Sequence, residues 1–538
     1  MSSGADTENM TEKQTVNLKI NGEEVEAPAG EMLIKVCHDR GLDVPFFCYH
    51  PGLVPEGNCR MCLVEVVKAS KPMPACTTPV AEGMEVETHS DPAKDARADV
   101  LEFMLSNHPL DCPICDKSGE CLLQDNSYDH GKDGSRMVEV KQLKPTKDLG
   151  KGVKLWGNRC ISCTRCVRFC SDVAGSGELT MVNRGDSSVV DVFPGYPLQN
   201  ALSGNVVDIC PVGALISEDF LYQARVWYEK KTPSVCHECA RGCNVEIQTL
   251  HNEVKRIVAR HNDSVNDYWI CDHGRYTHDY ILGPERSLQY RPENPAEAPG
   301  FLAEKLKGLV DEHGAESLGV VASAFMSNEA LYLLGSLMQE LGVPQENIAA
   351  CAREDGEEET FKGGFKISAD RNPNRSGVEA ILGREALTLR HDSLLEKAKA
   401  SKLRGLLLVS DLPGQQLSDE WIEALSTVEF GLVFLLENDS RIPASTYLVP
   451  ATAFSEREGS IISEDGQLQL VRAATQLPRG VLATEDLLQD TLSAFGARET
   501  KISPRGLFNE MAGVIPALAG ISHSDLGQAG LNIREGEK

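Results

Sequence analysis

Hydrophobic and polar residues alternate along the first part of the chain in the way that a small sheet requires. The run TVNLKINGEEVEA, residues 15–27, has the period of a strand, and the Asn21-Gly22 pair inside it is typical of a hairpin turn. The run MCLVEVV, residues 61–67, predicts a further strand. Between them, EMLIKVCHDRG predicts a short helix that ends at Gly41. The pattern therefore predicts a β-grasp arrangement with a cysteine-bearing loop.

A longer helix is expected after this sheet. Ser90 can cap its first turn, and Pro92 suits that turn because the N–H groups there have no partner in the helix. The apolar face expected for this helix consists of Ala96, Val100, Phe103 and Met104. Pro109 ends the helix and favours an extended backbone at His108, so we expect His108 in a loop.

The pattern changes from about residue 286 onward. Residues 316–325, 402–412 and 430–439 are apolar runs that predict buried strands, and residues 327–342 predict an amphipathic helix. Alternation of strands and helices predicts a parallel α/β sheet. The sequence has neither a G-x-G-x-x-G fingerprint after a strand nor a G-x4-G-K-[ST] loop, so no motif supports dinucleotide or triphosphate binding.

Composition narrows the class of protein. The chain has 538 residues, 53 basic and 80 acidic, and a net charge of -27. Such an acidic chain without a basic patch argues against nucleic acid as a partner. No run approaches the ~20 apolar residues of a membrane span, and the first residues lack the layout of a secretory signal. We therefore expect a cytoplasmic protein that reaches a membrane only through partner subunits.

The eighteen cysteines are concentrated in one half of the chain, since only Cys351 follows residue 271. Disulfides are improbable in a reducing compartment, so metal binding is the first expectation. Three cysteines fall outside the sets described below. Cys37 has the spacing of a buried core residue, and Cys351, in an acidic and loop-like context, is interpreted as a structural thiol. Cys170 is discussed with the third set.

The first set has the spacing C-x10-C-x2-C-x13-C and consists of Cys48, Cys59, Cys62 and Cys76. Its setting resembles a [2Fe-2S] ferredoxin domain, although plant-type ferredoxins begin with C-x4-C. The wider gap of ten residues is similar to the one in the first domain of the large iron–sulfur subunit of respiratory complex I and of related hydrogenases. A four-cysteine zinc site is the alternative.

The second set has the spacing H-x3-C-x2-C-x5-C and consists of His108, Cys112, Cys115 and Cys121. Three cysteines cannot fill the four iron corners of a [4Fe-4S] cluster, and an imidazole nitrogen can supply the fourth bond. The same spacing occurs in complex I subunits and in several iron hydrogenases. The alternative is that His108 is only a polar loop residue.

The third set begins in RCISCTRCVRFC, residues 159–170, which has the C-x2-C-x2-C-x3-C run of bacterial ferredoxins. In that pattern the fourth cysteine ligates the cluster of another run, and a Cys-Pro pair downstream, Cys210-Pro211, supplies the partner. The predicted [4Fe-4S] ligands are Cys160, Cys163, Cys166 and Cys210. Cys170 is left without a cluster. The alternative is that Cys170 closes the cluster and Cys210 is structural.

The fourth set has the spacing C-x2-C-x3-C-x27-C and consists of Cys236, Cys239, Cys243 and Cys271. Residues 244–260 between them alternate like a hairpin. The arrangement resembles the small [4Fe-4S] domain at the front of molybdopterin oxidoreductases. A zinc ribbon is the alternative, and three iron–sulfur signatures earlier in the chain favour iron.

The order of the four sets resembles the large iron–sulfur subunit of NADH:quinone oxidoreductase, strongly over about the first 285 residues. The resemblance implies an α+β and α/β multidomain protein with one [2Fe-2S] and three [4Fe-4S] clusters. The domains expected are a [2Fe-2S] ferredoxin-like domain (14–91), a [4Fe-4S] segment with one histidine and three cysteine ligands (92–131), a ferredoxin-like [4Fe-4S] domain (138–225), a molybdopterin-oxidoreductase-type [4Fe-4S] domain (229–285) and a shortened α/β domain (286–538).

No molybdopterin is expected, although residues 447–470 resemble a segment of molybdopterin oxidoreductases. About 250 residues are too few for the full architecture, and Cys351 is poorly placed to hold a metal. In active members a lysine follows the fourth cluster cysteine by two residues, where this chain has His273.

The implied function is electron relay without a catalytic residue of its own. Electrons are expected to enter from a flavin- and NADH-binding subunit and to leave toward iron–sulfur and quinone-site subunits, on the cytoplasmic side of the inner (plasma) membrane. The fourth cluster is expected to lie off this path. The rivals are a relay subunit of a soluble NAD-linked hydrogenase or formate dehydrogenase, and a zinc scaffold without redox function.

Overall fold

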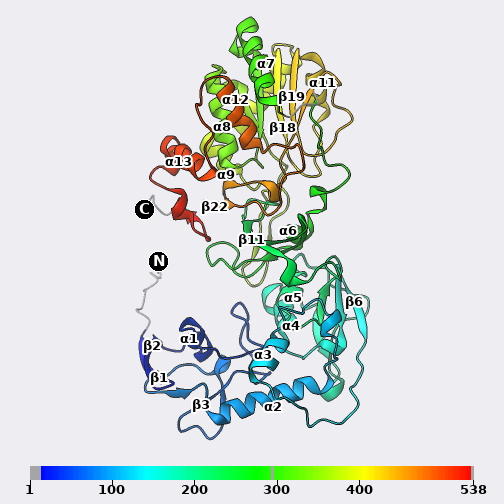
Figure 1. Cartoon of the computed structure of the whole chain (residues 1–538), viewed down its shortest axis with the longest axis vertical. Coiled ribbons are helices and arrows are strands. Elements are labelled where there is room, and N and C mark those ends of the chain that lie inside the picture. Colours follow the sequence, from blue (N-terminus) through cyan, green and yellow to red (C-terminus); the bar gives the residue numbers. More distant parts are fainter. Residues whose placement is uncertain (1–13, 292–295, 535–538) are drawn as a thin grey trace, which may run out of the picture. The chain divides into compact units, whose positions relative to one another are not determined.

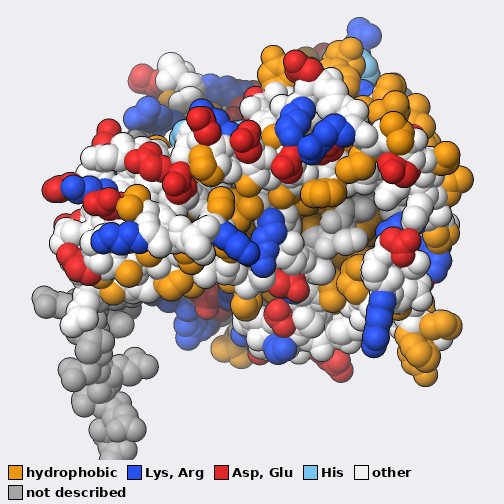
Figure 2. Space-filling model, turned by 90° about the horizontal axis from the view of Figure 1, so that it is seen from below, with side chains coloured by type: hydrophobic (Ala, Val, Ile, Leu, Met, Phe, Trp, Pro, Cys, Tyr) orange, Lys and Arg blue, Asp and Glu red, His pale blue; other side chains and the backbone are white. Residues whose placement is uncertain are grey.

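The computed structural model describes residues 14–291 and 296–534. The chain divides into two compact units, whose boundary in the sequence lies between Trp227 and Tyr228. Figure 1 shows the elements of each unit. Acidic and basic side chains are interspersed on the face that Figure 2 shows. None of the described helices has both the length and the apolar character needed to cross a membrane.

A small sheet with one helix begins the first unit. In spatial order its strands are β2 (Glu23–Pro28), β1 (Thr15–Ile20), β5 (Glu85–Glu87), β3 (Leu63–Val66) and β4 (Met73–Pro74). β1 and β2 form the predicted hairpin, whose turn has left-handed backbone at Asn21 (φ 52°) and Gly22 (φ 82°). Helix α1 (Leu33–Asp39) confirms the short helix. Its Cys37 is buried in the core, as predicted.

Helix α2 (Asp91–Asn107) confirms the longer helix, but the apolar face predicted for it is wrong in part. Phe103 is 68% exposed, whereas Arg97 and Leu101 are buried. The helix packs against β3, and Arg97 donates a hydrogen bond from Nε to the carbonyl oxygen of Leu63 at 3.0 Å. This contact with a distant strand turns the Arg97 side of the helix inward, which the spacing of apolar residues alone does not reveal.

Short elements make up the rest of the first unit. In chain order they are α3 (Leu122–His130), β6 (Thr146–Gly150), β7 (Val153–Trp156), α4 (Arg165–Arg168), β8 (Leu179–Val182), β9 (Val189–Val192), α5 (Asn205–Asp208) and β10 (Leu215–Ser217). Strands β10, β7 and β6 form one antiparallel sheet, and β8 pairs with β9. A π-helical turn, Phe169–Val173, directly continues α4.

The second unit begins with an antiparallel sheet of β11 (Lys230–Val235), β12 (Asn244–Leu250) and β13 (Glu253–Ala259). β12 and β13 form the hairpin that the sequence predicts over residues 244–260. Helix α6 (Asp272–Tyr276) follows, and its N-cap residue is Cys271.

A parallel sheet lies at the centre of the second unit, as the sequence predicts. Its strands in spatial order are β15 (Ile348–Cys351), β14 (Leu318–Ser323), β18 (Gly405–Ser410), β19 (Phe430–Leu435) and β20 (Tyr447–Pro450). The helices packed around it are α7 (Ala298–His313), α8 (Asn328–Glu340), α10 (Leu389–Lys399), α11 (Asp419–Thr427) and α12 (Thr484–Ala494). Figure 1 shows helices on both faces of this sheet.

The remaining elements of the second unit are short. They are β16 (Glu359–Thr360), β17 (Lys366–Ile367), α9 (Arg375–Ile381), β21 (Gly459–Ile462), β22 (Gln467–Val471), α13 (Pro504–Val514) and β23 (Leu531–Asn532). One sequence expectation is wrong here: Cys351 is not in a loop but ends strand β15, where it pairs with Ser323 of β14. The prediction failed because acidic residues follow Cys351 in the sequence, and such residues are typical of a loop.

Candidate metal centres

The first cysteine set is gathered by the loop between α1 and β3 and by the turn after β4. Cys48 and Cys76 are fully buried, and Cys62 is nearly so. The thiol of Cys48 is within hydrogen-bond reach of those of Cys59 and Cys76, and the thiol of Cys62 reaches that of Cys76. The backbone N–H of Cys48 also donates to Sγ of Cys59 at 3.3 Å. Four sulfur atoms this close together, inside a core, suit a shared metal group.

The second set lies at the end of α2 and in the turn before α3. Its cysteines interact with one another electrostatically, and burial raises the pKa of Cys121 to about 11. Cys112 is exposed, whereas Cys115 is buried. A Cβ atom on Gly213 would lie only 2.1 Å from Sγ of Cys115, so the backbone of Gly213 closes one side of this site.

His108 has the extended backbone predicted for a residue before proline, with φ -66° and ψ 131°. Burial, followed by the positive charge of Arg159, lowers its pKa to about 4, so the imidazole is neutral. Within the described part of the chain its Nδ1 atom is buried and has no hydrogen-bond partner. A buried, neutral and unpartnered ring nitrogen fits the missing fourth ligand. The positive charge of Arg159 also acts on the thiol of Cys115, so His108 and Cys115 share this charged neighbour.

The third set lines one pocket. The four cysteines share it with mostly apolar side chains and with Thr164 and Arg165. The residues of the third set are Cys160, Cys163, Cys166 and Cys210. The loop before α4 is tightly wound, with left-handed backbone at Ser162 (φ 53°) and Thr164 (φ 62°), and the N–H of Ser162 donates to Sγ of Cys160 at 3.4 Å. Burial raises the pKa of Cys163 to about 12.

Cys170 is not among the residues that line this pocket. It is fully buried in the π-helical turn that follows α4, and its carbonyl oxygen accepts a hydrogen bond from the N–H of Gly177 at 3.0 Å. Burial raises the pKa of its thiol to about 12. Its position is that of a core thiol.

The fourth set is formed by the loop between β11 and β12 and by the start of α6. All four thiols are buried and interact with one another. The N–H of Gly274 donates to Sγ of Cys271 at 3.4 Å. A Cβ atom on Gly274 would lie 2.7 Å from Sγ of Cys236, so this helix turn also packs tightly on the site.

A buried carboxylate lies within the fourth set, and sequence reasoning missed it. Glu238 is 1% exposed, and its two oxygens lie 2.8 Å from Nε2 of His237 and 2.8 Å from Nε2 of His273. Arg353 is 3.7 Å away. Burial alone would raise the pKa of Glu238, but the two histidines lower it well below its ordinary value. The available signal was a glutamate between the cysteines of CHEC.

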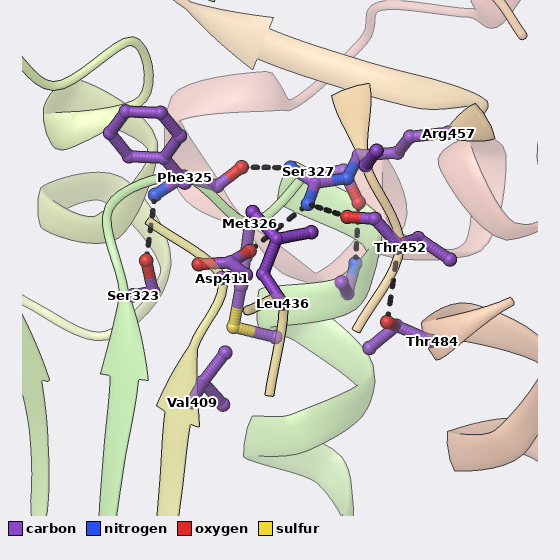
Figure 3. A network of polar contacts seen from close by, with 12 residues as sticks. Ser323, Phe325, Met326, Ser327, Val409, Asp411, Leu436, Thr452, Arg457 and Thr484 are labelled. Atoms are coloured by element: carbon purple, nitrogen blue, oxygen red, sulfur yellow. Dashed lines mark hydrogen bonds and ion pairs between the residues drawn. The ribbon is translucent and has the colours of Figure 1, made fainter. Parts of the chain in front are cut away.

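The carboxyl edge of the parallel sheet is filled by the chain's own side chains (Figure 3). Arg457 donates to the carbonyl oxygens of Phe325 and Thr452 and lies 3.0 Å from Oδ2 of Asp411. Thr452 in turn hydrogen-bonds Thr484. This edge is where open α/β sheets usually bind ligands. Here it holds a buried ion pair and its hydrogen bonds.

Four family models match the chain, and each contains one of the four sets. Their descriptions and ranges are 2Fe-2S iron-sulfur cluster binding domain (13–91), NADH-ubiquinone oxidoreductase-G iron-sulfur binding region (97–136), NADH-quinone oxidoreductase subunit 3, ferredoxin-like domain (150–216), and NADH-ubiquinone oxidoreductase NDSU1/NuoG-like, 4Fe-4S domain (229–279).

Curated relatives agree with these models. The G subunit of the NADH-quinone oxidoreductase of Rickettsia felis is 39% identical over 61% of this chain and 49% of its own length. The 78 kDa subunit of NADH-ubiquinone oxidoreductase of Neurospora crassa is 47% identical over 62% of this chain and 46% of its own length.

Residues 13–279 are thus similar to iron–sulfur domains, three of which are described for subunits of NADH-quinone or NADH-ubiquinone oxidoreductase. The chain spans about half the length of these relatives. A chain from the crystal structure of NAD+-reducing [NiFe]-hydrogenase in the H2-reduced state is 27% identical over 39% of this chain and 91% of its own length. Its TM-score of 0.36 is too low to carry a conclusion.

Proposed function

We propose that this chain is an electron-transfer subunit of an NADH:quinone oxidoreductase. The observation that carries the proposal is the coincidence of two independent findings. The fold gathers four separate sets of thiols, and each set lies inside a region that matches an iron–sulfur domain. Three of these domains are described for NADH-quinone or NADH-ubiquinone oxidoreductase subunits. Acting alone, one such set would suit zinc equally well. Four in this order favour iron–sulfur clusters.

We propose the following ligands. The [2Fe-2S] site consists of Cys48, Cys59, Cys62 and Cys76, and the [4Fe-4S] sites consist of His108 with Cys112, Cys115 and Cys121, of Cys160, Cys163, Cys166 and Cys210, and of Cys236, Cys239, Cys243 and Cys271. Bound clusters of these types supply one-electron transfer. The chain buries most of these cysteines, which limits the access of water to their sulfur atoms. It also contributes backbone N–H groups that stabilise thiolate charge, such as those of Ser162 and Gly274.

The five domain limits expected from the sequence are also proposals, at residues 14–91, 92–131, 138–225, 229–285 and 286–538. The start of the second unit, at Tyr228, agrees with the limit placed between residues 225 and 229. We infer that the last domain serves structure and binds no molybdopterin. This inference is supported by the side chains that fill the carboxyl edge of its sheet, above all Arg457 and Asp411.

The partners proposed are a flavin- and NADH-binding subunit on one side of the relay and iron–sulfur and quinone-site subunits on the other. Association with the membrane, on its cytoplasmic side, would come through these subunits. The names of the relatives, which describe subunits of NADH-quinone and NADH-ubiquinone oxidoreductases, support a place in a larger complex. The individual partners and the side of the membrane are proposed from the sequence resemblance described above.

Metal and sulfide analysis of the purified chain tests the proposal. We expect about fourteen iron atoms and as many acid-labile sulfides per chain, because one [2Fe-2S] and three [4Fe-4S] clusters contain that many. Zinc without sulfide would show that the chain is a metal scaffold without redox function. Co-purification with a hydrogenase, and not with quinone-reducing membrane subunits, would support the rival relay function.

A further inference from the structure

A buried arginine joins the backbone of the first metal site to that of the third. Arg165, on α4, is 4% exposed. Its Nη1 donates to the carbonyl oxygen of Ile209 at 2.9 Å, and its Nη2 donates to the carbonyl oxygen of Tyr49. Ile209 directly precedes Cys210, and Tyr49 directly follows Cys48. One guanidinium group therefore holds two ligand-bearing segments that are far apart in the sequence.

A second arginine on α4 reinforces this connection. Arg168 donates from Nη2 to the carbonyl oxygen of Cys48 and from Nη1 to that of Val54 at 2.6 Å. Its Nε lies 3.2 Å from Oε2 of Glu56. All three partners belong to the loop that carries Cys48 and Cys59. This loop is thus fastened to helix α4, which carries Cys166 of the third site.

The charge of Arg165 faces thiols of both sites. Its two hydrogen bonds go to neutral carbonyl oxygens, and it interacts electrostatically with Cys163, Cys210 and Cys48. A guanidinium stays protonated in proteins. Because charges act more strongly in a buried setting than in water, this cation stabilises negative charge on either side of it.

We propose that Arg165 is a positioning residue that couples the first and third metal sites, by fixing the spacing between them and by stabilising negative charge on both. The inference rests on the proposed function. Spacing matters because the rate of electron transfer falls steeply with distance. Charge matters because a cation beside a cluster favours the reduced form, which carries one more electron.

The substitution Arg165→Leu in the assembled complex removes both the charge and the hydrogen bonds. We expect the midpoint potentials of the first and third sites both to become more negative. The expected change is about a tenfold lower equilibrium constant for reduction at each, or about 59 mV for a one-electron couple. The potential of the fourth site should not change. Arg184→Leu, at an exposed arginine of the same unit, is the matched control and should change none of them.

The substitution Arg165→Lys separates the two roles, because an ammonium keeps the charge but lacks the planar fork that spans two carbonyl groups. We expect potentials close to those of the unaltered chain, and a broader distribution of distances between the reduced first and third sites by pulsed EPR. If Arg165→Leu assembles without clusters, this lysine variant alone decides the question.

Unchanged potentials in Arg165→Leu at full iron content would overturn the inference, as would a shift confined to one site. A distance distribution in Arg165→Lys identical to that of the unaltered chain would overturn it too. The proposed function fails separately, if the unaltered chain gives no signal from these sites. Normal signals there together with unchanged variants would refute only the role of Arg165.

Discussion

The third and fourth metal sites use the same kind of donor but have neighbours of opposite charge. Beside the third site lies the buried cation of Arg165, which contacts segments of two sites. Within the fourth site lies the buried carboxylate of Glu238, whose partners His237, His273 and Arg353 belong to the same unit. Since neighbouring charge and hydrogen bonds tune a cluster's potential, equal ligand sets need not have equal roles.

This difference shows that the side chains that join one site to another are not themselves the proposed ligands. The third site is joined to the first through Arg165 and lies next to the second through Arg159, which precedes Cys160 and pairs with Asp111 at 3.0 Å. The fourth site has its own charge network instead. From this contrast we propose that electrons pass through the first three sites and that the fourth site serves structure.

The largest effect is expected from Gly213→Ala. This substitution tests whether the second site can be lost while the first and third sites remain. The added Cβ would lie 2.1 Å from Sγ of Cys115, a distance that no relaxed packing permits. We expect the EPR signal of the second site to be lost and those of the others to persist. Gly134→Ala, where the added Cβ meets open space, is the control. An unaltered second signal would show that Cys115 is free to move and is no ligand.

A smaller effect is expected from His108→Cys. This substitution changes a proposed ligand, so its effect on the potential can be compared with that of changing a charged neighbour. A thiolate brings a negative charge where the imidazole is neutral, so the cluster should become harder to reduce. One [4Fe-4S] signal should move to a more negative potential in an EPR-monitored titration. If every signal keeps its potential, then His108 is only a loop residue.

Glu238→Gln tests the other side of the comparison. Removing a buried negative charge should raise the potential of the fourth site, by about a tenfold gain in the equilibrium constant for reduction, or about 59 mV. The first and third potentials should not move. If the potential of the third site changed and that of the fourth did not, the difference in charge proposed for the two sites would be contradicted. Glu253→Gln, at an exposed glutamate of the same unit, is the control.

The smallest effect on the clusters is expected from Cys37→Ser. Cys37 is fully buried in the core under the first sheet, so the hydroxyl should lower the free energy of unfolding by about 1–3 kcal/mol. All EPR signals should stay. Loss of the [2Fe-2S] signal at full stability would instead make Cys37 a ligand.

Local features of the fold were predictable from the sequence. The hairpin at Asn21-Gly22 follows from turn chemistry, and the extended backbone of His108 follows from Pro109. The parallel sheet follows from apolar runs alternating with helices. The spacing of the cysteines also grouped Cys160, Cys163, Cys166 and Cys210, which line one pocket, whereas the roles of all the cysteines as ligands stay predictions.

Features that depend on distant partners were not predictable. The inward side of α2 is set by the hydrogen bond from Arg97 to Leu63, and Cys351 is in a strand because β15 pairs with β14. Arg165 and Glu238 were missed for the same reason. Their roles come from carbonyl groups and histidines that only the folded chain places beside them.

The EPR spectra of two variants, Cys210→Ala and Cys170→Ala, test the account most directly, because they ask whether the third site is built from two distant segments. Cys210 lines the pocket with the other three cysteines, whereas Cys170 is a core thiol beyond it. We expect Cys210→Ala to lose one [4Fe-4S] signal and keep the rest, and Cys170→Ala to keep them all. Loss of that signal in Cys170→Ala, with Cys210→Ala unaffected, would contradict the account.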